Sequence, residues 1–164
     1  METVQRLMAA IGLELNEEKT QLVRLPERTF DFLGYTFGRF CTVKSRRWYW
    51  GTRPSKKALR RVCKRIHDET SQRWNPTTAE DRVGVLNPIL RGWCQYFNQG
   101  PVFREYDILK RYAARRFRRW LMKKHGRRGT GYRQYSDEYL YEKLGLYKPN
   151  VSLSRPAVSE GTTS

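Results

Sequence analysis

The segment LNPILRGWCQYF, residues 86–97, places its apolar residues at helical spacing. Asn87 is a favourable N-cap and Pro88 suits the first helical position, so we predict a helix that begins at this point. A helix with one apolar face must pack that face against neighbouring elements. The predicted apolar stripe consists of Leu86, Ile89, Leu90, Trp93 and Phe97.

Two longer amphipathic segments flank this helix, one over roughly 55–73 and one over about 104–125. Their predicted apolar stripes are Leu59, Val62, Cys63 and Ile66 in the first, and Tyr106, Leu109, Ala113, Phe117 and Trp120 in the second. The opposite arcs carry Lys56, Lys57, Arg60, Arg61, Lys64 and Arg65 in the first, and Arg111, Arg115, Arg118 and Arg119 in the second. Arg116 and Lys124 fall near the apolar stripe, where their stems can snorkel.

The residues before this helical region predict a small sheet. FDFLGYTF, residues 30–37, reads as one strand that is apolar on both faces. We expect it to pair with a strand at Thr20–Leu25 and with a hairpin over 39–50, and one sheet face to remain poorly covered. Residues 2–12 predict a short helix. The predicted fold class is therefore mainly α with a small N-terminal antiparallel β element, an α+β fold.

The remainder of the chain predicts a connector, a loop, a short helix and a tail. WNPTTAEDRVG is expected to be a connector, and HGRRGTGYRQY a glycine- and arginine-rich loop. Ser136 is expected to cap the last helix and Gly145 to end it. Residues 149–164 lack a core pattern and are predicted to be disordered. We therefore divide the chain into 1–52, 53–148 and the tail 149–164.

The charge of the chain indicates a polyanionic partner. Among 164 residues, 33 are lysine or arginine and 16 are aspartate or glutamate, which gives a net charge of +17. Such an excess repels itself unless it is neutralised, so RNA or DNA is the first candidate and an anionic membrane surface the second. No apolar run is long enough to span a bilayer. Three scattered cysteines fit a reducing cytoplasm and favour neither a disulfide framework nor a zinc site.

A self-contained active site is not predicted. A two-metal polymerase or nuclease needs clustered carboxylates, but no two aspartates are adjacent here. The sequence also lacks a P-loop, a GxSxG motif and an HExxH motif. We therefore assign no catalytic residue, no metal site and no cofactor to this chain.

Nucleic-acid binding is better supported, because long basic runs contain no acidic residue. Neither Lys56–Arg65 nor Lys110–Arg128 includes an aspartate or glutamate, whereas solvated helix faces usually alternate the two signs. SRRWYWGTR, residues 45–53, interleaves aromatic and basic residues, and one of its aromatics either stacks on a base or fills the core. Gly92, which costs about 1 kcal/mol relative to alanine in a helix, suggests close approach of another helix or of RNA. The predicted RNA-binding residues are Arg46, Arg47, Trp48, Trp50, Lys56, Lys57, Arg60, Arg61, Lys64, Arg65, Arg91, Arg111, Arg115, Arg118, Arg119, Arg127 and Arg128.

Three segments in order resemble a known family. GLELNEEKT (12–20) and then FDFLGYTF (30–37) are similar to the closing part of the palm in reverse transcriptases of bacterial group II introns. LNPILRGWCQYFNQG (86–100) with the following basic helix resembles the maturase-specific domain of those proteins. The resemblance implies a palm end with a β-hairpin over 1–52 and a thumb and maturase-like helical bundle over 53–148. The implied palm-motif remnants are Lys19, near the departing pyrophosphate, and Phe32, Leu33, Gly34 and Tyr35, in the hairpin that supports the primer end. The maturase-like match falls on Asn87, Leu90, Arg91, Gly92, Trp93, Tyr96 and Phe97.

The family's catalytic aspartates, including its YxDD turn, would lie before residue 1, so the resemblance implies no polymerase activity for this chain alone. The favoured hypothesis is a cytoplasmic, truncated, RNA-binding maturase-type module that assists folding and splicing of structured RNA, in particular group II intron RNA. The alternative is a fragment of a full RNA-directed DNA polymerase, which would need Mg²⁺ at the missing catalytic palm and the remainder of the reverse transcriptase as partner. A third reading is a general basic nucleic-acid or membrane-surface protein, although we expect no membrane partner.

Overall fold

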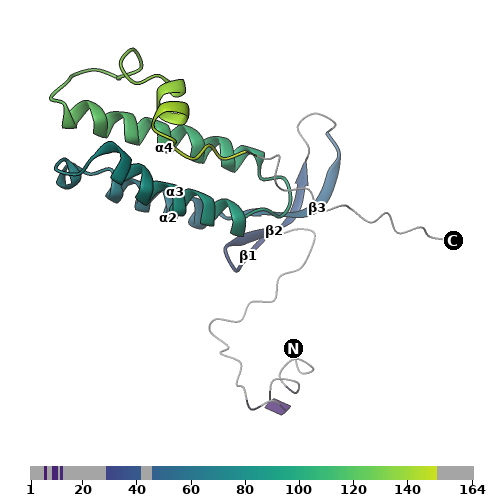
Figure 1. The fold of residues 1–164 in the computed structure, drawn as a ribbon. Helices are drawn as coiled ribbons and strands as arrows, with labels where there is room; N and C mark the ends of the chain where they lie inside the picture. Colours follow the sequence, from purple (N-terminus) through teal and green to yellow (C-terminus); the bar gives the residue numbers. More distant parts are fainter. Residues whose placement is uncertain (1–5, 7–8, 11, 13–28, 42–45, 151–164) are drawn as a thin grey trace.

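The structure is a computed structural model that describes residues 6, 9–10, 12, 29–41 and 46–150. A small antiparallel sheet precedes a group of helices, which confirms the predicted α+β class (Figure 1). The expected strand at Thr20–Leu25, the residue Lys19 and the tail from 151 onward lie outside the described residues, as does most of the expected helix over 2–12.

The sheet has three strands in the order β1-β2-β3: β1 (Phe30–Phe32), β2 (Tyr35–Cys41) and β3 (Trp48–Pro54). Both pairs are antiparallel, and Cys41 lies opposite Trp48 across the β2–β3 hairpin. This hairpin was expected from the sequence.

FDFLGYTF is a tight hairpin and not the single strand that its apolar residues predicted. Phe32 pairs directly with Tyr35, so Leu33 and Gly34 form a two-residue turn. Both have positive φ, 48° and 82°, as a type I′ turn requires. Leucine is rare in this conformation, so the sequence pattern concealed the turn. A Cβ on Gly34 would lie 3.0 Å from the Phe97 ring, so a glycine lets the turn dock on the helices.

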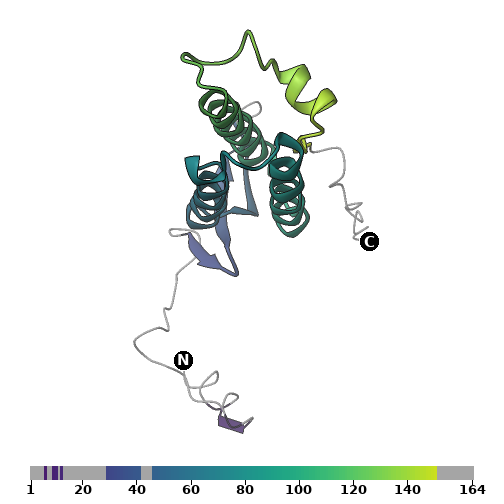
Figure 2. The same cartoon turned by 60° about the vertical axis from the view of Figure 1, so that its left-hand side comes forward.

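Three helices follow the sheet: α2 (Lys56–Glu69), α3 (Ala79–Tyr96) and α4 (Phe103–Lys124). A 3-10 turn, η1 (Gln72–Trp74), joins α2 to α3, and a π-helical segment, η2 (Tyr139–Lys143), follows α4. Seen nearly end-on, the three long helices occupy the corners of a triangle, with η2 beside them (Figure 2). Together they enclose the main core.

Helix α3 begins earlier than the sequence suggested. Thr78 is its N-cap in a capping box with Asp81, so most of the expected connector is helical. Pro88 therefore lies inside the helix, where it removes the backbone bond to the carbonyl of Gly84. Both residues are on the exposed side, where water can satisfy that carbonyl. Asn87 is accordingly not the N-cap that we predicted.

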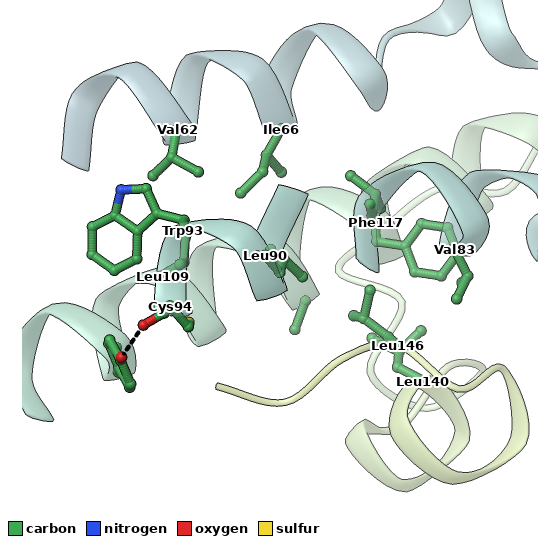
Figure 3. Packing of buried hydrophobic residues seen from close by; sticks show 14 of the residues in the cluster. Val62, Ile66, Val83, Leu90, Trp93, Cys94, Leu109, Phe117, Leu140 and Leu146 are labelled. Carbon is green, nitrogen blue, oxygen red and sulfur yellow. Dashed lines mark hydrogen bonds between the residues drawn. The ribbon is translucent and has the colours of Figure 1, made fainter. Parts of the chain in front are cut away.

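The core lies between the three long helices. Val62 and Ile66 of α2 face Trp93 and Leu90 of α3, and Phe117 closes the other end (Figure 3). The stripe on α2 is centred on Ala58, Val62 and Ile66, whereas the expected Leu59 and Cys63 are half-buried. The expected stripe of α4 is fully buried, with Tyr106, Leu109, Ala113, Phe117 and Trp120 each at most 3% exposed.

Polar contacts connect the ends of these helices. The hydroxyl of Tyr106 donates to the carbonyls of Cys94 and Phe97, at 2.7 and 3.0 Å, which satisfies the last turn of α3. Arg116 of α4 donates from Nε to Thr70 Oγ1 at 3.1 Å, and Lys124 donates to the carbonyl of Asn75 at 2.7 Å. The aliphatic parts of these two side chains therefore lie along the apolar surface while their charged groups form hydrogen bonds, as the helical spacing suggested.

Candidate nucleic-acid interface

Helix α2 presents the clearest basic face. All six of the expected cations on this helix are exposed, and none forms an ion pair with another described residue. Ser55 caps the helix, accepting a hydrogen bond from the N–H of Ala58 at 3.1 Å, so the helix begins directly after β3. An acid-free row of exposed cations is the arrangement that phosphate groups bind.

The basic residues of α4 are more varied. Arg111 pairs with Asp107, one turn earlier, and Lys110 lies 3.6 Å from the same carboxylate. Their charge is therefore partly neutralised. Arg115 and Arg119 are exposed, as are Arg127 and Arg128 in the loop after the helix. These four remain available to a polyanion.

Arg118 does not face solvent, contrary to the prediction. Its side chain is 1% exposed and lies on the core side of α4. Its Nε donates to the carbonyl of Tyr135 at 2.7 Å, its Nη2 pairs with Asp137, and its guanidinium lies 3.9 Å from the centroid of the Tyr132 ring. Because the chain returns over this face after the loop, Arg118 is a structural residue that fastens the loop and cannot contact RNA.

The sheet carries exposed aromatic residues on one face. Trp48 and Trp50 are 60% and 54% exposed, whereas Tyr49 points to the other face and contacts Phe40, with ring centroids 6.1 Å apart. The guanidinium of Arg39 lies 5.2 Å from the Trp48 ring. Of the three aromatic residues whose role was open, the two tryptophans are therefore available to stack. Arg46 and Arg47 are exposed at the start of β3.

Trp50 forms one wall of a shallow apolar depression of about 320 Å³. Phe30 and Phe37 stack on each other, with ring centroids 5.2 Å apart, and form the opposite wall. Phe32, also on this face, is 58% exposed. Among the described residues, one face of the sheet is therefore poorly covered, as the sequence predicted.

A larger cleft of about 620 Å³ lies between α2 and α3 and is bounded by the Leu33–Gly34 turn. Among the described residues that line it, Arg61 and Arg65 alone are charged, and neither pairs with a described carboxylate. Gly92 lines the cleft, and a Cβ built on it would meet nothing within 4 Å. No other helix of the described ranges approaches Gly92, so of the two explanations offered for this glycine the packing of another described helix does not apply.

The remaining cations belong to separate surfaces. Lys56 lines a cleft of about 460 Å³ with Arg53 and Arg104, between the sheet and α4. Arg111 and Arg115 line another, of about 380 Å³, with Tyr132 and Tyr141. Arg91 is exposed on α3 and lies over the Tyr147 ring at 5.5 Å. Sequence reasoning named Arg53 only as part of the aromatic and basic stretch 45–53. It did not identify Arg104, because Arg104 meets Arg53 and Lys56 only through tertiary contacts.

The described residues contain no cluster of three or more histidine, cysteine or carboxylate side chains that could hold a metal ion. Within the same ranges, no helix has the length and hydropathy needed to cross a bilayer. The core cysteine, Cys94, is a poor nucleophile and metal ligand, because burial raises the pKa of its thiol to about 12 and keeps it protonated.

Residues 59–139 match the family model of the group II intron, maturase-specific domain. The match supports a maturase-type domain. It covers most of α2, all of α3 and α4, and the loop fastened by Arg118. The basic face of α2 from Arg60 onward lies within it, as do Arg61 and Arg65 of the cleft. No curated protein matches the chain.

Proposed function

We propose that this protein is an RNA-binding, maturase-type module that binds structured group II intron RNA and assists its folding and splicing. The observation that carries the proposal is the acid-free basic face of α2, four of whose six cations, from Arg60 onward, lie inside the segment that matches the maturase-specific domain. Phosphates neutralised by such a face release counterions, which supplies salt-dependent affinity. The exposed tryptophans of the sheet add stacking surfaces for unpaired bases.

The proposed RNA surface comprises the α2 face, the free arginines of α4 and its following loop, and the aromatic face of the sheet. Arg118 is excluded from it, and Arg111 contributes weakly because Asp107 neutralises it. We retain the division into 1–52 and 53–148 as part of the proposal, with most of the sheet belonging to the end of a palm and the helices to a thumb and maturase-like bundle; β3 continues two residues past this boundary, to Pro54. The connection from β3 into α2 is short, since Pro54 ends the strand and Ser55 caps the helix.

Binding to RNA tests the proposal. The full chain is titrated with a labelled group II intron transcript, and with a transcript of equal length and shuffled sequence, at physiological salt. We expect tighter binding to the intron and faster splicing when Mg²⁺ is limiting. Equal affinity for both transcripts would overturn the intron role, and equal binding to RNA, DNA and anionic vesicles would favour a general basic protein.

A second candidate is the C-terminal part of an RNA-directed DNA polymerase. The hairpin at Leu33–Gly34 favours it, because Phe32, Leu33, Gly34 and Tyr35 resemble the palm hairpin that supports a primer end and here dock against α3. In that case the catalytic carboxylates and their Mg²⁺ would be supplied by sequence upstream of Met1. Translation of the upstream DNA distinguishes the two: an in-frame YxDD favours the polymerase, and stop codons exclude it.

A further inference from the structure

The cleft between α2 and α3 has no role in the contacts described so far. Its walls are Ala58 and Val62 from α2 and Ile89, Trp93 and Phe97 from α3. These side chains make the interior apolar, and its volume of about 620 Å³ lies in the range of sites that accept small planar groups. Arg61 and Arg65 line the same cleft from one side of α2, one turn apart.

We propose that this cleft receives one unstacked nucleobase of the bound RNA, while Arg61 and Arg65 hold the adjoining phosphates. The inference rests on the proposed RNA-binding function and assigns it a specific pocket. A ligand that is flat and apolar at one end and anionic at the other fits an apolar slot beside two unpaired guanidinium groups.

The cleft is held open by its own structure. The hydroxyl of Tyr35 donates to the carbonyl of Tyr96, and the hydroxyl of Tyr96 donates to the carbonyl of Leu33 at 2.9 Å. These reciprocal bonds fasten the β1–β2 turn to the end of α3. Because the turn forms one boundary of the cleft, a ligand would enter a largely preformed site and lose little affinity to ordering it.

Two residues of the cleft depart from what local stability favours. Leu33 adopts φ of 48° and is 67% exposed at the boundary of the cleft, although asparagine is preferred at this turn position. Gly92 lies within a helix, where alanine would be more stable, and the space beside it is open. The strained backbone of Leu33 and the uncovered backbone at Gly92 lie at the same cleft, and this combination points to a ligand contact.

The wall of the cleft also contains an unsatisfied donor. Trp93 is 9% exposed, and its Nε1 has no hydrogen-bond partner among the described residues. Figure 3 shows this nitrogen on the side of the ring that faces Val62 and α2, and both Trp93 and Val62 line the cleft. A buried N–H normally has an acceptor, and a base inserted here could supply one from its edge after a small rotation of the indole.

The test compares two hairpin RNAs that share the same loop: the stem of one carries a single bulged uridine, and the stem of the other is fully paired. Binding of the full chain is measured by fluorescence anisotropy across a series of salt concentrations. We expect wild type to bind the bulged hairpin about tenfold more tightly. Gly92→Leu fills the cleft and should remove this preference, while the dependence of affinity on salt stays unchanged because the phosphate contacts remain.

Gly84→Leu is the matched control. Gly84 also lies on the exposed side of α3 with nothing within 4 Å of a built Cβ, but it does not line the cleft. It should keep the preference. Leu33→Asn supplies a second variant that relieves the turn; it should fold at least as stably as wild type and still lose part of the preference.

A cross-link locates the base directly. With 4-thiouridine at the bulge, we expect ultraviolet cross-links to Trp93 or Tyr96. Cross-links confined to Trp48 and Trp50, a preference that survives Gly92→Leu, or equal binding of both hairpins by wild type would overturn the pocket and leave the cleft to another occupant, such as an apolar side chain of a protein. Those results leave RNA binding standing, whereas failure of both hairpins to bind would overturn the proposed function as well.

Discussion

The Nε of Arg118 donates to the carbonyl oxygen of Tyr135 at 2.7 Å, so a buried guanidinium on α4 holds the returning chain 17 residues later. Its Nη2 also pairs with Asp137, whose side chain is largely exposed. Replacing Arg118 by Ala leaves the Tyr135 carbonyl unsatisfied and removes packing under Tyr132. We expect a loss of about 2–4 kcal/mol in the free energy of unfolding, measured by urea denaturation.

Arg119 is the matched control for this substitution, because it is the next residue of α4 and is exposed. Arg119→Ala should change the free energy of unfolding by less than about 0.5 kcal/mol and should weaken RNA binding. Equal stability losses in the two variants would contradict the structural assignment of Arg118.

Asn87 connects α3 to the C-terminal segment. Its Nδ2 donates to the carbonyl of Gly145 at 2.9 Å, and its Oδ1 accepts from the N–H of Tyr147 at 2.7 Å. Asn87→Ala should lower the free energy of unfolding by about 1–3 kcal/mol and reduce hydrogen-exchange protection at Tyr147. Gln95→Ala, at an exposed position of the same helix, should do neither. Unchanged protection at Tyr147 in the Asn87 variant would show that the segment is held by packing alone.

The helices were predictable because their apolar spacing is strong and local. The stripe of α4 from Tyr106 to Trp120 follows the 3.6-residue period and is buried throughout. The start of α3 was wrong because Asn87-Pro88 is a favourable start signal by local rules, and only tertiary contacts reveal that Asn87 bonds to residues near 145. An asparagine that caps a helix and one that bridges to a distant segment look the same in the sequence, because both use the same side-chain hydrogen-bonding groups.

The sequence predicted which basic residues form the candidate nucleic-acid interface better than it predicted how they are arranged in space. The exposed cations of α2 follow from its helical period. Arg118 belongs to the basic run of α4, but it is buried by a loop that returns from 17 residues away. The cleft could not be found in advance, because it joins the Leu33 turn to two helices that are distant in sequence. The apolar pattern also did not reveal the tight turn, because leucine is rare at positive φ; only the family resemblance implied a hairpin there.

The basic face of α2 should control the salt dependence of RNA binding. We expect the triple variant Lys57→Gln, Arg60→Gln and Lys64→Gln to flatten the slope of log K against log salt by about 2–3, because each phosphate contact contributes about 0.7–0.9. The residues are exposed and unpaired within the described chain, so folding should be retained. Binding isotherms at several salt concentrations measure the slope.

A control with the same change in charge separates local contact from net charge. Arg133→Gln, Lys143→Gln and Lys148→Gln neutralises three exposed cations of the C-terminal segment. This second triple variant should leave the slope nearly unchanged. The same flattening in both triple variants would mean that net charge governs binding and that α2 has no special role.

Alkaline pH should destabilise the helical domain, because folding keeps buried thiol and phenol groups protonated. Burial raises the pKa of the Cys94 thiol and of the Tyr141 hydroxyl, each to about 12. In the unfolded chain these groups titrate near about 8.5 and 10. The folded state therefore binds more protons in this window, so the free energy of unfolding is highest below it and falls as pH rises toward 12.

Urea midpoints measured from neutral pH upward will follow this fall. Tyr141→Phe removes one of the groups whose pKa is raised by burial and should make the fall shallower while changing stability at neutral pH little. Tyr139→Phe, at a more exposed tyrosine of the same segment, is the control and should follow wild type. A fall that is identical in wild type and Tyr141→Phe would show that Tyr141 does not contribute.

Trp50 should contribute to RNA affinity through stacking and not through charge. It is 54% exposed beside the stacked rings of Phe30 and Phe37. Trp50→Ala should weaken binding of single-stranded RNA by about 1–3 kcal/mol, with an unchanged salt slope, because no phosphate contact is lost. Phe103→Ala is the control, since Phe103 is 71% exposed at the start of α4, outside the sheet, and should bind RNA like wild type. If Trp50→Ala binds single-stranded RNA as tightly as wild type, Trp50 does not stack on the RNA and the aromatic face of the sheet serves some other contact. Stacking on an exposed indole tolerates any base, so its loss should weaken binding of any single-stranded sequence.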